Sequence, residues 1–308
     1  MFGKIIKDIR KEKGLTQKEL AVKLALSSVE FASIDFVTVS RWELGKTKPN
    51  IAKSIRVIRC LSNDIGPYLE WIQCSSLSDS FEEYLYEFYD SVYHRAILAA
   101  VGKNDLNSVN IESCKLSLSP KDNDLDKLIL FDSQLNDGSS GLTSKDLYLY
   151  QETNRMYCNK IVDRNDKYVT LGHSIAFFFD CEYINGNFNN NENTIDLDKS
   201  VRYQSNVRLA MYLYSCNSLS SSIFKLNWGK VLSYLSIHAN ITDFYINVST
   251  DLEAKYFSSL GFKIVSCSRP VKYGGIRLGG LRFEKCVYKI DTSKLLSDND
   301  SIFLVKNS

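Results

Sequence analysis

The chain lacks the residue patterns that mark a zinc protein, a membrane-spanning protein or an exported protein. No two of its eight cysteines form a C-x-x-C pair, and only three histidines are present. This disfavours a zinc finger or any other metal site and favours free thiols in a reducing cytosol. No window of about 18 apolar residues occurs, and the N-terminus has no apolar signal-like stretch. We therefore expect a cytoplasmic protein without a membrane span.

The chain also lacks a large excess of charge of either sign. Its 308 residues carry a net charge of only +2, so the whole chain is not a general polyanion binder. The first 60 residues, however, hold 13 Lys and Arg against six Asp and Glu. A basic head is thus joined to a slightly acidic body. Length alone suggests about two domains of roughly 150 residues each.

Apolar residues in the head recur at helical spacing. They predict a bundle of four or five helices over residues 1–62. Gly14 ends the first helix, and Thr16 with Glu19 forms a capping box at the start of the second. The residues expected in the core are Phe2, Ile5, Ile6, Ile9, Leu20, Ala21, Leu24, Val39, Trp42, Ile51, Ile55, Ile58 and Leu61.

Two segments of the head carry a family resemblance. They are GLTQKELA at residues 14–21 and TVSRWELGKTKP at residues 38–49. Together they resemble the lambda-repressor/Cro-like (XRE) helix-turn-helix family, over about a fifth of the chain. The resemblance implies binding to double-stranded DNA by a homodimer, with half-sites one helical turn apart.

The resemblance also implies roles for individual residues. The amide of Gln17 would hold a backbone phosphate at a helix N-terminus. Asp35 would cap the recognition helix, Arg41 would read guanine, and Glu43 would form an ion pair within the domain. The start of that helix, from Phe36, would enter the major groove first. The DNA-binding surface assigned in this way is Gln17, Lys18, Val37, Thr38, Ser40, Arg41, Lys46 and Lys48.

The connection before the recognition helix departs from the family pattern. Residues 26–35 make it roughly eight residues longer than the usual tight turn. One interpretation is an extra helical turn on the solvent side. The other is an added surface for DNA backbone, a second subunit or a partner. Because Phe31 or Phe36 can instead complete the core, Arg41 is a safer base reader than Phe36.

The rest of the chain divides into two expected regions. Residues 63–124 form a connecting and helical region, in which an aromatic stripe over 80–101 indicates a packed helix. Residues 125–308 form an α/β domain. Its expected strands are 128–131, 168–171, 174–183, 207–214, 244–248, 262–265 and 286–290, its helices are 147–161, 223–239 and 252–260, and 185–194 is a loop.

The order of these elements is similar to the GNAT acyltransferase fold, with Leu260-Gly261-Phe262 resembling that family's last β-α-β unit. The resemblance spans about residues 125–292. It implies an α+β domain, a mixed sheet with flanking helices, and allows acetyl-CoA or acyl-CoA as ligand. The loop that would wrap the coenzyme pyrophosphate, residues 216–222, has no glycine.

A second departure concerns the family's tyrosine acid. That position falls on Phe257, and the adjacent Tyr256 points about 100° away on a helix. We therefore assign no catalytic residue, expect no cofactor and favour sensing or assembly for the body. His173 with Asp180, Cys181 and Glu182 is interpreted as structural rather than catalytic. The glycine-rich ribbon 274–282 is expected to be a hairpin rather than an anion cradle.

Three hypotheses follow from these patterns. The first is a sequence-specific transcription regulator whose body dimerises or senses a small ligand. The second is an acyl-CoA-dependent N-acyltransferase that carries a DNA-binding head. The third is an antitoxin-like or phage-borne protein whose body binds another protein.

Overall fold

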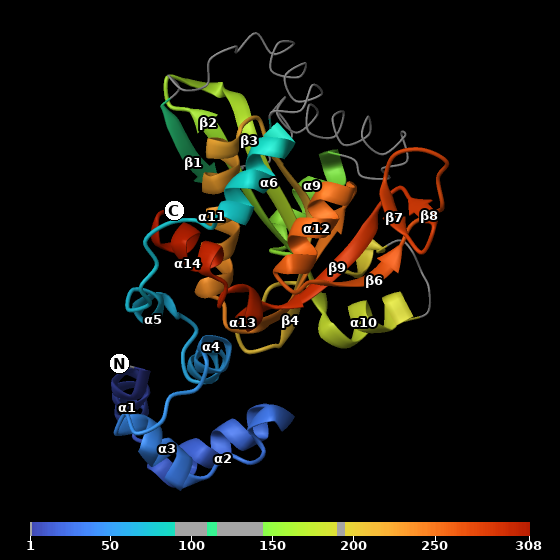
Figure 1. Ribbon diagram of the computed structural model, residues 1–308. Coiled ribbons are helices and arrows are strands. Elements are labelled where there is room, and N and C mark those ends of the chain that lie inside the picture. The colour runs from blue at the N-terminus through green and yellow to red at the C-terminus, as the bar shows by residue number, and fades with distance from the viewer. Residues whose placement is uncertain (1, 90–109, 116–143, 190–194) are drawn as a thin grey trace.

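The computed structural model describes residues 2–89, 110–115, 144–189 and 195–308 (Figure 1). A helical head is followed by a mixed sheet with helices on its faces, so the predicted fold class is confirmed. The predicted strand 128–131 and residues 90–101 of the helix predicted over 80–101 lie outside the described residues. Among the described residues, no helix is both long and apolar enough to cross a membrane.

The head is built from four α-helices and one short 3-10 helix. The Thr16–Glu19 capping box is present, and Asp35 caps the recognition helix through the backbone N–H of Thr38. Every expected core residue is buried or half-buried. The elements are α1 (Phe2–Glu12), α2 (Gln17–Ser27), η1 (Val29–Phe31), α3 (Phe36–Glu43) and α4 (Ile51–Arg59).

The long connection before α3 contains η1. Phe31 and Ile34 of this segment are buried, whereas Phe36 is 47% exposed. Phe31 is therefore the aromatic residue that completes the core. The side chain of Val29 is exposed to solvent. The connection therefore has a buried side and a solvent-exposed side.

The body is organised around a seven-stranded sheet of order β1-β2-β3-β4-β5-β9-β6. Among the described strands of this sheet, β4 and β5 pair in parallel and the other neighbours are antiparallel. The strands are β1 (Ile111–Lys115), β2 (Met156–Asp163), β3 (Asp166–Asp180), β4 (Leu209–Ser218), β5 (Ile241–Val248), β6 (Lys263–Cys267) and β9 (Cys286–Asp291). The sheet begins at Ile111, upstream of residue 125, and the three-part division of the chain stays a prediction.

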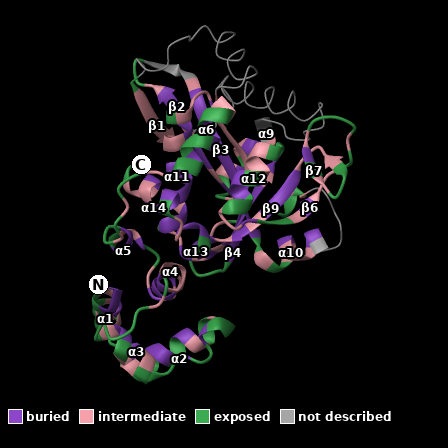
Figure 2. Cartoon of the chain, viewed as in Figure 1, coloured by how far each residue is buried: buried purple, intermediate pink, exposed green. Residues whose placement is uncertain are grey.

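Helices cover both faces of this sheet. Alternation along β3 sends Phe178 to the core beneath α11 and sends Phe177 and Phe179 to the core beneath α9 and α10. Buried residues therefore follow the sheet between the helices (Figure 2). The helices are α5 (Gly66–Leu69), α6 (Asp79–Tyr89), α9 (Ser144–Glu152), α10 (Cys181–Asn189), η2 (Leu197–Lys199), α11 (Ser221–Ser236), α12 (Asp251–Ser259), α13 (Thr292–Leu295) and α14 (Asn299–Lys306).

Most expected elements of the body are present with shifted ends. The predicted strands 207–214, 244–248, 262–265 and 286–290 are β4, β5, β6 and β9, and the predicted helices 223–239 and 252–260 are α11 and α12. Gly261, at φ +92°, follows α12. The ribbon is a hairpin of β7 (Ile276–Leu278) and β8 (Leu281–Phe283), turned by Gly279 and Gly280 at positive φ. α13 and α14 were not predicted from the sequence.

Three expectations were wrong: the helix 147–161, the two separate strands 168–171 and 174–183, and the loop over 185–194. The predicted helix 147–161 ends at Glu152, because the chain turns through Asn154 at φ +55° and then pairs as β2. The two strands expected at 168–171 and 174–183 are one strand, β3. Gly172 does not break it, because it pairs with Ile161 of β2 and with Ser218 of β4. A Cβ there would lie 2.8 Å from Ile223 and 3.0 Å from the Asn217 oxygen, so the close packing needs glycine. Residues 181–183 belong to α10, which extends into the expected loop.

The contact between α1 and α3 predicts a severe effect of Gly3→Ala. A Cβ on Gly3 would lie 1.9 Å from the backbone oxygen of Trp42. We expect Gly3→Ala to lower the free energy of unfolding by about 1–3 kcal/mol, measured by urea denaturation with hydrogen exchange of head amides. Gly186→Ala is the matched control, since its Cβ would meet nothing within 4 Å in α10. Equal stability of the Gly3 variant and the native chain would refute the tight α1–α3 contact.

Candidate DNA-binding interface

The carboxylate of Glu43 joins three helices of the head. Arg10 on α1 donates from Nε to Glu43 Oε1 (2.5 Å) and from Nη2 to Oε2 (3.0 Å). Gln17, the first residue of α2, donates from Nε2 to Glu43 Oε2 (2.8 Å). The Glu43 side chain is only 3% exposed. The expected intradomain ion pair is confirmed, and the end of α3 is fixed against α1 and α2.

The electrostatics of Glu43 follow from these contacts. Burial raises the pKa of its carboxyl, but hydrogen bonds from Arg10 and Gln17 outweigh burial and leave this pKa below its ordinary value. The same ion pair raises the pKa of the Arg10 guanidinium. Charged Glu43 is therefore the stable form at neutral pH.

The outer face of α3 is open at the residues assigned to base contact. Arg41 is exposed, Val37 is 36% exposed, and Thr38 and Ser40 are half-buried. The side chain of Thr38 hydrogen-bonds the Asp35 carboxylate, and this lowers the pKa of Asp35. The Thr38 methyl and the Arg41 guanidinium remain as groups that suit thymine and guanine edges.

The residues flanking α3 supply positive charge. Lys18 lies over the ring of Phe36, with its Nζ 5.5 Å from the ring centroid. After α3, the N–H of Gly45 bonds to the Trp42 oxygen and the N–H of Lys46 to the Arg41 oxygen, which is a Schellman motif with Gly45 at φ +69°. This turn brings Lys46, and then Lys48, out of the helix as exposed side chains. Such lysines suit backbone phosphates.

The other candidate groups in the body do not form one site. His173 is buried, its Nε2 lies 2.8 Å from the hydroxyl of Ser215, and burial lowers its pKa to about 4. Asp180 instead accepts the backbone N–H groups of Glu182 and Tyr183 at the start of α10. Within the described ranges, no three His, Cys, Asp or Glu side chains gather as metal ligands.

The helix α6 packs against α11 and α12 and reaches the end of β4. Tyr84 of α6 stacks on Tyr256 of α12, with ring centroids 4.4 Å apart and planes at 8°. Phe81 packs between Tyr256 and Phe224 of α11, and a side-chain hydrogen bond joins Tyr89 to Ser218 at the end of β4. α6 thus lies across α11 and α12 (Figure 1).

The start of α6 is fixed as well. The backbone N–H and the hydroxyl of Ser78 each donate to Asp300 of α14, at 2.6 Å. Lys225 of α11 pairs with Glu82 of α6 at 2.8 Å. The described part of the aromatic stripe, up to Tyr89, is therefore core packing against α11 and α12.

Comparison with protein families matches the model described as Helix-turn-helix to residues 6–65. This match agrees with the XRE-like resemblance of the head. A comparison with curated protein sequences finds no match.

Solved structures similar to the body are N-acyltransferases. The chain is similar to FeeM, an N-acyl amino acid synthase from uncultured soil microbes (10% identity, 65% of this chain and 99% of that one, TM-score 0.40). It is also similar to NAA60 of Arabidopsis thaliana in complex with acetyl-CoA (15%, 59% and 98%, 0.36). A third is spermidine N-acetyltransferase of Vibrio cholerae with CoA and spermine (13%, 60% and 98%, 0.35). Because these TM-scores are low, the body is described from its own strand order and not from the similar structures.

The Glu43 network predicts a pH-dependent stability. The folded-state pKa of Glu43 is lowered, so its stabilisation is present above the unfolded value of 4.5 and is lost as pH falls through the folded value. We expect Glu43→Gln to cost about 1–3 kcal/mol at pH 7, because Arg10 loses its buried anion, and less at pH 3. Urea denaturation at both pH values measures this.

Glu12→Gln is the control, because Glu12 is exposed at the end of α1. It should change stability by less than about 0.5 kcal/mol at both pH values. A cost of Glu43→Gln that is the same at pH 3 and pH 7 would contradict the proposed charge dependence.

Proposed function

We propose that the protein is a sequence-specific DNA-binding transcription regulator that reads its operator with α3. The observation that carries this is the arrangement of α3: Glu43 fixes its C-terminal end against α1 and α2, and Arg41 is exposed on its outer face. Lys46 and Lys48, which follow α3, are exposed as well and suit backbone phosphates. A helical bundle that had only a structural role would not need these three exposed cations.

We further propose that the protein binds DNA as a homodimer. Helix-turn-helix proteins of this kind place two recognition helices in successive major grooves, about 34 Å apart. In this proposal, the role of the body is to dimerise or to sense a small ligand. Selection of bound sites from random DNA tests these points together, since it returns the operator and the spacing of its half-sites.

Substitutions of Arg41 and Lys46 should have different effects on DNA binding. Arg41→Ala should cost about 1–3 kcal/mol at the selected operator and relax the choice of one base. Lys46→Ala should weaken all sequences alike and lower the slope of log K against log salt by about one. Fluorescence anisotropy titrations at several salt concentrations measure both.

Lys272→Ala is the matched control. It removes one exposed positive charge from the segment before β7, on the body, and should leave operator binding and its salt slope unchanged. Unchanged operator affinity in both Arg41→Ala and Lys46→Ala would refute the docking of α3.

The acyltransferase hypothesis is disfavoured by the region around the loop after β4. The resemblance would place a coenzyme pyrophosphate at this loop, whose approach needs glycines. Here Tyr89 of α6 bonds to Ser218, the buried ring of Phe257 stands where a tyrosine acid is expected, and Tyr256 is stacked on Tyr84. These residues do not fit the coenzyme.

Calorimetry separates the two functions. We expect acetyl-CoA to give no binding heat with the full chain, and no turnover on amine substrates. As a control, an N-acetyltransferase with established acetyl-CoA binding is titrated under the same conditions. Turnover by the native chain that disappears in Tyr256→Phe would show that the body is an enzyme.

A further inference from the structure

A buried arginine joins the head to the body. Arg59, the last residue of α4, is 9% exposed. Its guanidinium donates to four backbone oxygens where α11 ends and β5 begins. They are those of Leu235 (2.8 Å), His238 (3.1 Å), Ala239 (3.2 Å) and Ile241 (2.6 Å). Burial lowers its pKa to about 10, so it stays charged at neutral pH and suits the negative end of α11. The position of α4 on the body is therefore fixed.

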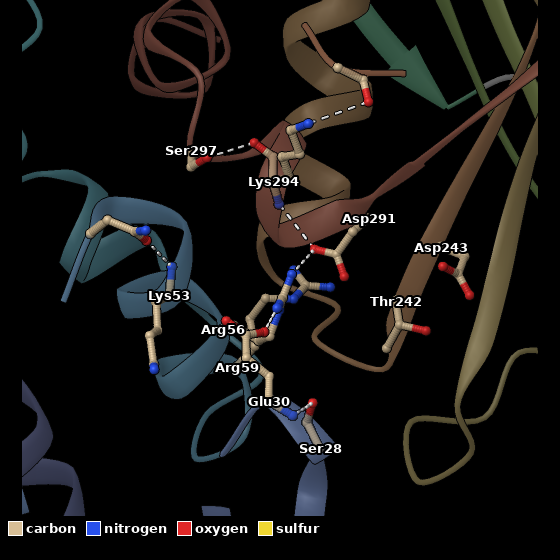
Figure 3. Close-up of polar contacts among 12 residues, drawn as sticks. Ser28, Glu30, Lys53, Arg56, Arg59, Thr242, Asp243, Asp291, Lys294 and Ser297 are labelled. Atoms are coloured by element: carbon tan, nitrogen blue, oxygen red, sulfur yellow. Dashed lines mark hydrogen bonds and ion pairs between the residues drawn. The ribbon is translucent and has the colours of Figure 1, made fainter. Parts of the chain in front are cut away.

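Arg56 lies one turn earlier on the same helix and contacts both parts of the protein (Figure 3). Its Nη2 is 3.1 Å from Asp291 Oδ1, and its Nη1 pairs with Glu30 Oε2. Asp291 ends β9 and also accepts the backbone N–H of Lys294 at the start of α13. Glu30 belongs to η1 of the long connection. One guanidinium thus links an inner strand of the sheet to the head.

Glu30 lies close in sequence to the recognition helix. Only five residues separate it from Phe36, where α3 begins, and two of these, Phe31 and Ile34, are buried in the head. A shift of Glu30 must therefore move the buried Phe31 and with it the entry to α3. The added residues of the connection are what bring a carboxylate within reach of Arg56.

The contacts of Arg56 and those of Arg59 contribute differently to the stability of the head–body junction. The side chains of Arg56, Glu30 and Asp291 are 29%, 40% and 40% exposed. Such partly exposed pairs contribute about 0–1 kcal/mol each, too little to hold the head on the body. Arg59, with four buried carbonyl partners, is the stronger anchor. The Arg56 pairs can therefore set an orientation without deciding whether the protein folds.

We propose that Arg56 is a positioning residue for DNA recognition, through which the body sets the entry to α3 by way of Asp291 and Glu30. The long connection then serves as the contact of the head with the body. This inference rests on the proposed function for its effect on DNA. The contact itself can be tested without DNA.

The test uses Glu30→Gln, Asp291→Asn and the double variant in the full chain. Asn at 291 can still cap α13, so only the charge is lost, and this charge acts on Arg59 at longer range as well as on Arg56. We expect each single variant to lower the ratio of operator to random-duplex affinity about 2–5-fold in anisotropy titrations. Because both carboxylates act through one guanidinium, the double variant should lose less than the product of the single effects.

Glu82→Gln is the matched control. It removes one negative charge from an ion pair of the body, with Lys225, and should leave the affinity ratio unchanged. The ratio cancels the general gain in DNA affinity that follows from removing an acidic charge. An unchanged ratio in Asp291→Asn, or strictly multiplicative effects in the double variant, would overturn the inference.

Hydrogen exchange of the free protein separates this inference from the proposed function. Asp291→Asn should speed exchange of amides at residues 29–37, although the substitution lies in the body. Faster exchange without any operator binding by the native chain would support the contact and refute the DNA-binding function. Unchanged exchange would refute the contact, whatever the DNA result.

Discussion

The guanidinium of Arg59 satisfies four carbonyl oxygens at the point where α11 ends, and the arrangement of the whole protein depends on it. An uncapped helix end buried at a domain junction would leave several acceptors without partners. Apolar packing also joins the two parts, since α4 contacts α13 and residues of head and body share one hydrophobic cluster, but Arg59 is the residue that binds the carbonyl groups at this junction. These hydrogen bonds fix α4 on the body, and the head that contains the recognition helix is fixed with it.

α11 runs from this junction to the region where α6 packs against α11 and α12 near the end of β4. Its 16 residues span about 24 Å. Its first turn follows the loop after β4, where Tyr89 bonds to Ser218, and its last turn is capped by Arg59. The aromatic packing of α6 against α11 and α12 therefore stabilises the same helix that anchors the head. The side chains that pack between α11 and α12 thus also support the head.

The sequence predicted the head far better than the body, for physical reasons. Capping residues such as Thr16 and Asp35 act over three or four residues, so their partners could be named in advance. In the body, the end of α9 depends on a left-handed Asn154, and β3 runs through Gly172 because β4 packs closely against it. Such causes lie in tertiary contacts and not in local periodicity.

The residues of the candidate site also divide into those whose exposure local sequence predicts and those whose role depends on distant contacts. Exposure of Arg41, Lys46 and Lys48 follows from helix periodicity and the stop at Gly45. Arg56 and Arg59 were seen only as part of a basic head, because their partners in the body lie about 180 to 235 residues away. Together with Arg10, which pairs with Glu43, three of the cations of the basic head are thus used within the protein. A count of positive charges therefore overstates the surface offered to DNA, and the residues that remain on α3 and after it carry more of the electrostatic attraction than the composition implies.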